Sequence, residues 1–147
     1  MINEEQYIIT LAAEEGATLS SGSLRLYAIP SAPANSSLIT HHSSLPPVGA
    51  IDLYNYDPLN HRAAVGIMVS KEYRRQGYAL AMLRELEHSS FITHHSTLHT
   101  LFADIAATNT ASIALFKKAG YEQCGHFKEW LAVNDHYVDS IRMQKIL

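Results

Sequence analysis

The chain has 147 residues, of which 47% are hydrophobic and 17% charged, so it is one ordinary globular domain over residues 1–147 rather than a disordered segment or a coiled coil. Its net charge of -3 gives no basic surface for nucleic acid, its single cysteine excludes an internal disulfide, and its nine histidines lack the spacing of metal ligands. No apolar run approaches the roughly 20 residues that span a bilayer. We therefore expect a cytoplasmic protein with no metal ion and no nucleic-acid or membrane partner.

The N-terminal third predicts one helix, one strand and a loop. Asn3 can cap a helix over residues 3–15, which has acidic residues in its first turn and an apolar stripe along one side. Residues 24–29 form a strand-like run. The segment 30–47 is rich in Ser, Pro and Asn, which is typical of a long surface loop.

The rest of the chain predicts a mixed sheet. Two strands joined by a short turn indicate an antiparallel hairpin, and a helical pattern follows Gly77. In chain order the predicted elements are strands at 48–54 and 62–69, the helix after Gly77, a strand at 98–105, a helix at 110–119, and strands at 121–133 and 137–146. The β-α-β stretch in the middle implies at least one parallel crossover. The predicted fold class is therefore α/β (α+β), with a mixed, mostly antiparallel sheet and flanking helices.

The segment from Val69 to Ala79 leaves a strand, makes a basic turn and opens a helix. This geometry directs backbone N–H groups and the positive end of a helix dipole at one point, which suits a pyrophosphate or a similar anion. Gly77 lets the backbone come close, the small side chain of Ala79 avoids a clash, and Arg74 and Arg75 add positive charge. Taken alone, the pattern is also typical of an ordinary basic helix start.

A second segment runs from Asn109 to Tyr121, begins with a polar cap and ends at a glycine before an aromatic strand residue. The two segments together resemble the GNAT superfamily of N-acetyltransferases. The acetyl-CoA motif of that family, Arg/Gln-x-x-Gly-x-Gly/Ala, matches Arg74, Gly77 and Ala79. The tail from Lys128 to Asp139 looks like the branch that holds ribosomal-protein N-terminal acetyltransferases and spermidine acetyltransferases.

The resemblance covers residues 48–147, where it implies an acetyl-CoA-binding core. It leaves residues 1–47 as a shortened acceptor-side part, in which an N-terminal strand and helix of the family are expected to be absent. Either the chain is shortened there, or a partner subunit covers an edge strand at residues 24–29. An uncovered edge strand favours pairing with another chain, so we expect a homodimer.

The resemblance implies that acetyl-CoA lies between the strands 62–69 and 98–105, which splay apart in the family. The residues that it implies as acetyl-CoA-binding lie at the end of the first of these strands, in the loop and helix start that follow it, and in the second helix. They are Met68, Val69, Arg74, Arg75, Gln76, Gly77, Tyr78, Ala79, Asn109, Ser112 and Phe116. Asn109 has an alternative role as a simple helix cap, and Ser112 as a polar residue of the helix surface.

The implied reaction is direct attack of a primary amine, on a small molecule or a peptide, on the thioester carbonyl. An ammonium group with a pKa of about 10.4 loses its proton at pH 7 at a cost of roughly 4–5 kcal/mol, so a carboxylate base is expected. The catalytic candidates are Asp104, which matches a glutamate base position of some relatives, and Asp52, which matches an acidic position of polyamine-acetylating relatives. For each aspartate, the alternative is a structural carboxylate at a strand end, with its hydrogen bonds made within the protein.

One residue departs from the family pattern. Many relatives carry a tyrosine at the position of Phe116, as general acid to the leaving thiolate, and phenylalanine cannot donate a proton. Tyr54, Tyr121 and Tyr137 are candidate substitutes, with aromatic packing as the alternative for each. Two other functions stay open at this point: a non-catalytic acyl-CoA-binding GNAT module, and an unrelated α/β protein that binds an anion or a nucleotide.

Overall fold

The computed structural model describes residues 9–30, 46–89, 92 and 98–147. Within them, the strands form a seven-stranded sheet in the order β1-β2-β3-β4-β5-β7-β6. The strands are β1 (Ile9–Ala12), β2 (Leu24–Pro30), β3 (Gly49–Asp57), β4 (Arg62–Val69), β5 (Thr100–Ala106), β6 (Glu122–Val133) and β7 (His136–Ile146). The helices are α1 (Tyr78–His88) and α3 (Thr110–Lys118), with 3-10 turns at Leu19–Ser21 and Lys71–Tyr73. The predicted mixed, mostly antiparallel α/β class is confirmed.

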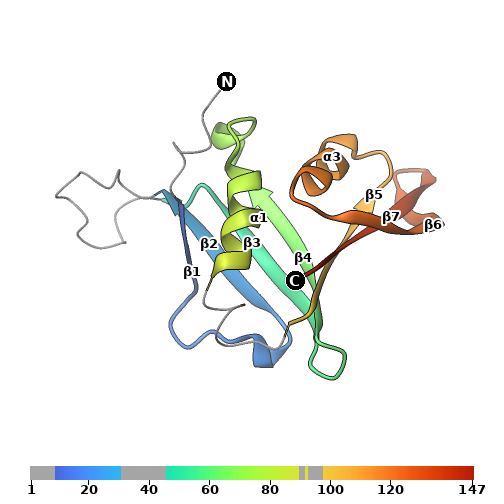
Figure 1. Ribbon diagram of the computed structural model, residues 1–147. Helices are drawn as coiled ribbons and strands as arrows, with labels where there is room; N and C mark the ends of the chain where they lie inside the picture. Colours follow the sequence, from blue (N-terminus) through green and yellow to red (C-terminus); the bar gives the residue numbers. More distant parts are fainter. Residues whose placement is uncertain (1–8, 31–45, 90–91, 93–97) are drawn as a thin grey trace.

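Alternation along the strands separates two faces of the sheet. One set of strand residues forms the core beneath α1 and α3, and examples are Leu26, Ile51, Leu53, Leu101 and Met143. Figure 1 shows α1 in front of the first four strands, with α3 beside it. We call this the helical face. The alternating residues on the opposite side form what we call the polar face: Arg25, Asp52, Tyr54, Asp104 and Arg142.

β4 and β5 run parallel and pair over a short stretch. Their register extends from Arg62 opposite Thr100 to Ala64 opposite Phe102, where the pairing ends. β4 continues to Val69 paired with β3, whereas β5 continues paired with β7. The two strands therefore diverge beyond Ala64, as the resemblance implies, and no strand of the described residues pairs with either edge along the gap.

The predicted helix over residues 3–15 is wrong where the structure describes it. Ile9–Ala12 form β1, which pairs antiparallel with β2, and residues 1–8 lie outside the described residues. Ile9 is only 5% exposed, because β1 lies against α1. The local pattern, a few apolar residues at helical spacing, could not predict this strand, because strand pairing depends on a partner far away in the sequence.

An N-terminal strand is therefore present, contrary to the prediction that it is absent. Residues 24–29 are not an edge strand either, because β2 lies between β1 and β3. The predicted loop at 30–47 falls mostly outside the described residues. The other predicted strands and helices are found close to their predicted bounds.

Candidate active site

The loop between β4 and α1 is braced by its own side chains. Arg74 Nε donates a hydrogen bond to the carbonyl oxygen of Val69 at 3.0 Å, and Gln76 Nε2 donates to that of Glu72 at 3.0 Å. Arg75 and Gly77 have φ angles of 62° and 90°, which is the left-handed region. The turn thus depends on Gly77, which adopts this conformation without a steric penalty.

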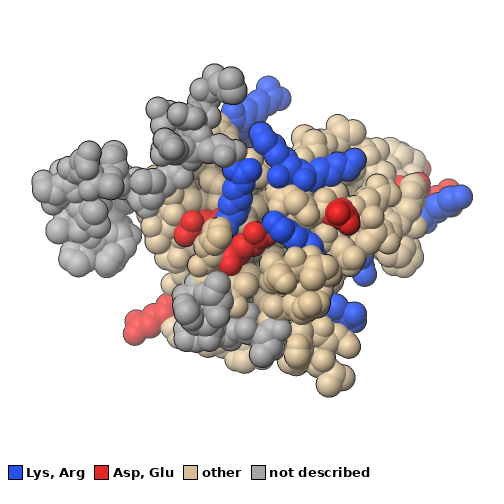
Figure 2. All heavy atoms as spheres, viewed as in Figure 1, with Lys and Arg blue, Asp and Glu red and all other residues tan. Residues whose placement is uncertain are grey.

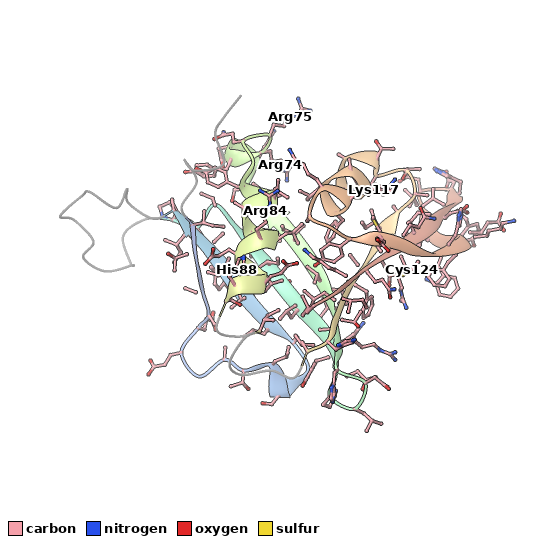
Figure 3. The ribbon with its side chains drawn as sticks, viewed as in Figure 1. Arg74, Arg75, Arg84, His88, Lys117 and Cys124 are labelled. Carbon is pink, nitrogen blue, oxygen red and sulfur yellow. The ribbon has the colours of Figure 1, made fainter. Side chains whose placement is uncertain are left out.

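Gly77 is also the N-cap of α1, and it has no side chain to accept a hydrogen bond from the first helical turn. The positive end of the helix dipole at this point favours an anionic ligand. Figure 3 shows Arg74 and Arg75 at this end of α1, with Arg84 and His88 further along the helix. The loop therefore combines a helix N-terminus with two arginines, an arrangement that favours an anionic ligand.

A groove of about 460 Å³ opens beside this loop on the helical face. It runs from the end of β4 across the loop to α3, and its lining is Ile67, Val69, Tyr73, Arg74, Arg75, Gly77, Tyr78, Ala79, Leu80, Ala111, Ser112, Leu115 and Lys118. A second groove of about 390 Å³ continues along α1 and shares Arg75, Gly77, Leu80 and Lys118 with the first. Figure 2 shows basic side chains gathered around this end of α1 and over α3.

Seven of the eleven predicted acetyl-CoA residues thus line the first groove, and Gln76 lines the second. The other three, Met68, Asn109 and Phe116, line neither groove. The backbone of Met68 belongs to β4, while its side chain is 57% exposed and alternates to the polar face. Asn109 caps α3, because its Oδ1 accepts a hydrogen bond from the Ser112 N–H at 3.1 Å. Phe116 is 3% exposed and packs edge-on against Tyr121 at 4.9 Å between ring centroids.

The two candidate bases are both held by arginines. Arg25 Nε and Nη2 donate to the carboxylate oxygens of Asp52 at 2.7 and 2.8 Å. Arg142 Nε and Nη2 donate to those of Asp104 at 2.7 and 2.9 Å. The hydrogen bond from Arg142 to Asp104 raises the pKa of Arg142 above its usual value. The Arg142 guanidinium also lies 4.6 Å from the centroid of the Phe102 ring.

These two ion pairs are features that the sequence did not predict. Asp52 and Asp104 lie on the same face, but each side chain has a fixed arginine partner from a neighbouring strand. Arg25 is opposite Asp52, and Arg142 is opposite Asp104, in the strand register. Only the register could have revealed them, because the partners lie 27 and 38 residues apart in the chain.

The three candidate tyrosines have different surroundings. Tyr121 is 3% exposed, and its hydroxyl has no hydrogen-bond partner among the described residues. Burial, together with the nearby carboxylate of Glu87, raises the pKa of Tyr121. Tyr137 is 66% exposed, at the start of β7. Tyr54 is half-buried on the polar face, and burial and the Asp104 carboxylate raise its pKa, with an opposing effect from Arg142.

The chain belongs to the acetyltransferase (GNAT) domain family, which matches residues 7–122. This match covers most of the chain and confirms the resemblance. The alternative of an unrelated anion-binding protein is therefore wrong. Acetyl-CoA is the acetyl donor that this family uses.

The chain is similar to a spermidine N(1)-acetyltransferase of Vibrio cholerae, with 26% identity over 97 residues that make up 65% of this chain and 54% of the relative. The chain thus spans about half the length of that protein. Among solved structures, a Vibrio cholerae spermidine N-acetyltransferase in complex with CoA and spermine has a TM-score of 0.70 at 20% identity, over 86% of this chain and 67% of the other. A dodecameric structure of the Vibrio cholerae enzyme has a TM-score of 0.67 at 21% identity, over 85% and 65% of the two chains.

Two further features are absent from the described residues. No helix there is long and apolar enough to cross a membrane. The same residues hold no cluster of three or more His, Cys, Asp or Glu side chains that could bind a metal ion.

Proposed function

We propose that this chain is an acetyl-CoA-dependent N-acetyltransferase that moves an acetyl group to a primary amine by direct attack on the thioester. The divergence of β4 and β5 beside the braced loop and the basic groove supports the proposal most strongly. This arrangement offers a strand edge for the amide-bearing arm of acetyl-CoA and an anion site for its pyrophosphate. The GNAT family assignment supports the same donor.

The acceptor is a primary amine, and the similar Vibrio cholerae enzymes make polyamines the first to test. On the polar face, Asp52, Asp57 and Asp104 form ion pairs with Arg25, Arg62 and Arg142. The charges there are therefore balanced within the chain, and they give no reason to prefer a polycation over a monoamine or a peptide N-terminus. Residues 24–29 are not an edge strand and so do not support the predicted homodimer, which stays a prediction supported by the dodecamer that one similar enzyme forms.

Binding of the donor is tested first, by thermal denaturation with CoA and with pantetheine, which lacks the pyrophosphate. CoA at a hundred times its Kd should stabilise the fold by about 2.7 kcal/mol, and pantetheine at the same concentration should have far less effect. Lys118 lines both grooves whereas Lys117 lines neither, so Lys118→Ala should weaken CoA binding about fivefold and Lys117→Ala should not. Equal stabilisation by CoA and pantetheine would contradict the anion site.

Turnover is tested by the release of free CoA thiol from acetyl-CoA across a panel of polyamines, small monoamines and N-terminal peptides. We expect release with at least one class of amine. The second candidate function is a non-catalytic acyl-CoA-binding module, which the buried Phe116 and the arginine-held aspartates favour. Tight CoA binding with no thiol release from any amine would select that module.

A further inference from the structure

We infer that Tyr54 is the proton donor to the leaving CoA sulfur, in place of the tyrosine that the family pattern would put at position 116. This inference rests on the proposed acetyl transfer and assigns a further catalytic residue to it. Phe116 has no acidic proton to donate, and its ring is buried against Tyr121. A phenol that reaches the same reaction must therefore come from another element.

Tyr54 is placed by β3 at the point where β4 and β5 diverge. It lies opposite Ala64, which is the last β4 residue paired with β5. Its ring lies over Gly66, where a Cβ atom would be only 3.4 Å from the Tyr54 Cε1 atom. Because Gly66 has no side chain, the Tyr54 ring can lie against β4, the strand that borders the gap.

The groups around Tyr54 favour a neutral phenol. The Asp104 carboxylate from β5 and the Arg142 guanidinium from β7 both act electrostatically on Tyr54, and so does Asp52 from its own strand. The ring is half-buried, and its pKa is raised, so the hydroxyl keeps its proton through the neutral and mildly alkaline range. A phenol that stays protonated is the form that can act as an acid.

The other two tyrosines do not fit this role. The Tyr121 hydroxyl is buried near Glu87 and has no hydrogen-bond partner among the described residues. Tyr137 lies five residues before Arg142 along β7, which is about 17 Å of extended strand. Among the three candidates, Tyr54 alone is both half-exposed and next to the divergence of β4 and β5.

Tyr54 gives up one proton and regains one in each turnover. The ammonium form of the acceptor first loses one proton to water or to a carboxylate, and the neutral amine then attacks. Its nitrogen forms the C–N bond, the C–S bond breaks, and the electron pair of that bond goes to sulfur while the Tyr54 hydroxyl gives sulfur its proton. The nitrogen loses one proton, which passes through Asp104 or water and restores the Tyr54 phenol. The products are the amide and free CoA thiol, with Tyr54 unchanged.

The first test compares Tyr54→Phe with Tyr56→Phe on the acetyl-CoA and amine reaction. Tyr56 lies on the same strand and packs against the core, so it controls for loss of a hydroxyl from β3. Tyr54→Phe should lower kcat about 100-fold, with a KM for acetyl-CoA within about twofold of wild type. A fall in kcat of less than about threefold, or a raised KM at unchanged kcat, would overturn the assignment.

The second test places 3-fluorotyrosine at position 54, and at position 56 as the control. Its more acidic phenol should move the alkaline limb of the kcat profile to lower pH at position 54 and leave it unmoved at position 56. In the absence of turnover, the fluorine resonance at position 54 should shift when CoA is added, and that at position 56 should not. An unmoved limb or an unmoved resonance at position 54 would overturn the inference. Absence of thiol release from the wild-type protein would instead remove the proposed function itself.

Discussion

The two faces of the sheet are built from different kinds of information. On the helical face, the loop between β4 and α1, which we call the anion loop, is local. Arg74, Gly77 and the start of α1 follow one another in the chain, and each hydrogen bond that braces the loop spans at most five residues. On the polar face, Asp104 and Arg142 meet only because β5 and β7 pair in one register. The proposed donor side of the site is thus specified by one short segment of sequence, and the proposed acceptor side by contacts between distant strands.

The difference has a functional consequence. The loop is encoded in one short run of sequence, whereas the polar face can change with single substitutions on separate strands. The ion pairs of this face are half-exposed, so each contributes little to stability. Their main effect is to orient the carboxylates and to hold Arg142 over Phe102.

The largest expected effect comes from Gly49→Ala, a substitution on β3 opposite the end of β4. A Cβ atom at Gly49 would collide with the carbonyl oxygen of Met68 and lie 3.1 Å from Val69 Cα, so the end of β4 must move. We expect a loss of about 3 kcal/mol in the free energy of unfolding, together with weaker CoA binding, because β4 leads into the anion loop. Chemical denaturation and CoA titration measure both effects.

Gly66→Ala is the matched control for Gly49→Ala. A Cβ atom at Gly66 meets only the Tyr54 ring at 3.4 Å, so the free energy of unfolding should fall by less than about 1 kcal/mol. If both variants lost the same stability, the close approach at Gly49 would have no special role.

The second prediction separates the two aspartates of the polar face. Asp104 lies on β5 beside the gap, whereas Asp52 lies one strand further away on β3. Asp104→Asn should lower kcat about 100-fold, as the loss of a general base does, and Asp52→Asn should lower it less than tenfold. Both substitutions weaken an ion pair with an arginine, so each controls for that loss in the other.

The pH profile of kcat decides whether Asp104 titrates in the reaction. The acidic limb should be present in the wild type and in Asp52→Asn, and absent in Asp104→Asn. An unchanged limb in both variants would leave neither aspartate as the base. A larger loss of kcat in Asp52→Asn than in Asp104→Asn would assign the general base to Asp52 on β3.

Most of the fold could be predicted from the sequence, because its signals are local. Turns and glycines bound the strand at 62–69 and the helix after Gly77, and the structure has them at Arg62–Val69 and Tyr78–His88. The failure at residues 3–15 has the opposite cause. Ile9–Ala12 become a strand through pairing with β2, and no local pattern contains that partner.

The site divides in the same way. The groove could be predicted because the family motif names residues that are contiguous in the chain. The partners Arg25 and Arg142 could not, because a strand sequence shows which residues share a face but not which strand lies beside it. Tyr54 is one of three candidate tyrosines, and its partial burial and its register beside Ala64 distinguish it from the others.

The smallest expected effect concerns Asn109, where a structural and a binding role coincide in one side chain. Its Oδ1 caps α3 by accepting the Ser112 N–H, which leaves the amide nitrogen for the predicted contact with acetyl-CoA. Asn109→Asp keeps an oxygen acceptor at the N-cap, and aspartate is as good a cap as asparagine, so stability should be unchanged. Loss of the amide donor should raise the KM for acetyl-CoA by about fivefold.

Asn109→Ala is the companion variant, because it removes both groups. It should cost about 1 kcal/mol in the free energy of unfolding and raise the KM to the same extent as Asn109→Asp. A normal KM in Asn109→Asp, with the stability loss confined to Asn109→Ala, would reduce Asn109 to a helix cap. In that case the recognition of acetyl-CoA would rest on the β4 edge and the anion loop, which are the most local parts of the helical face.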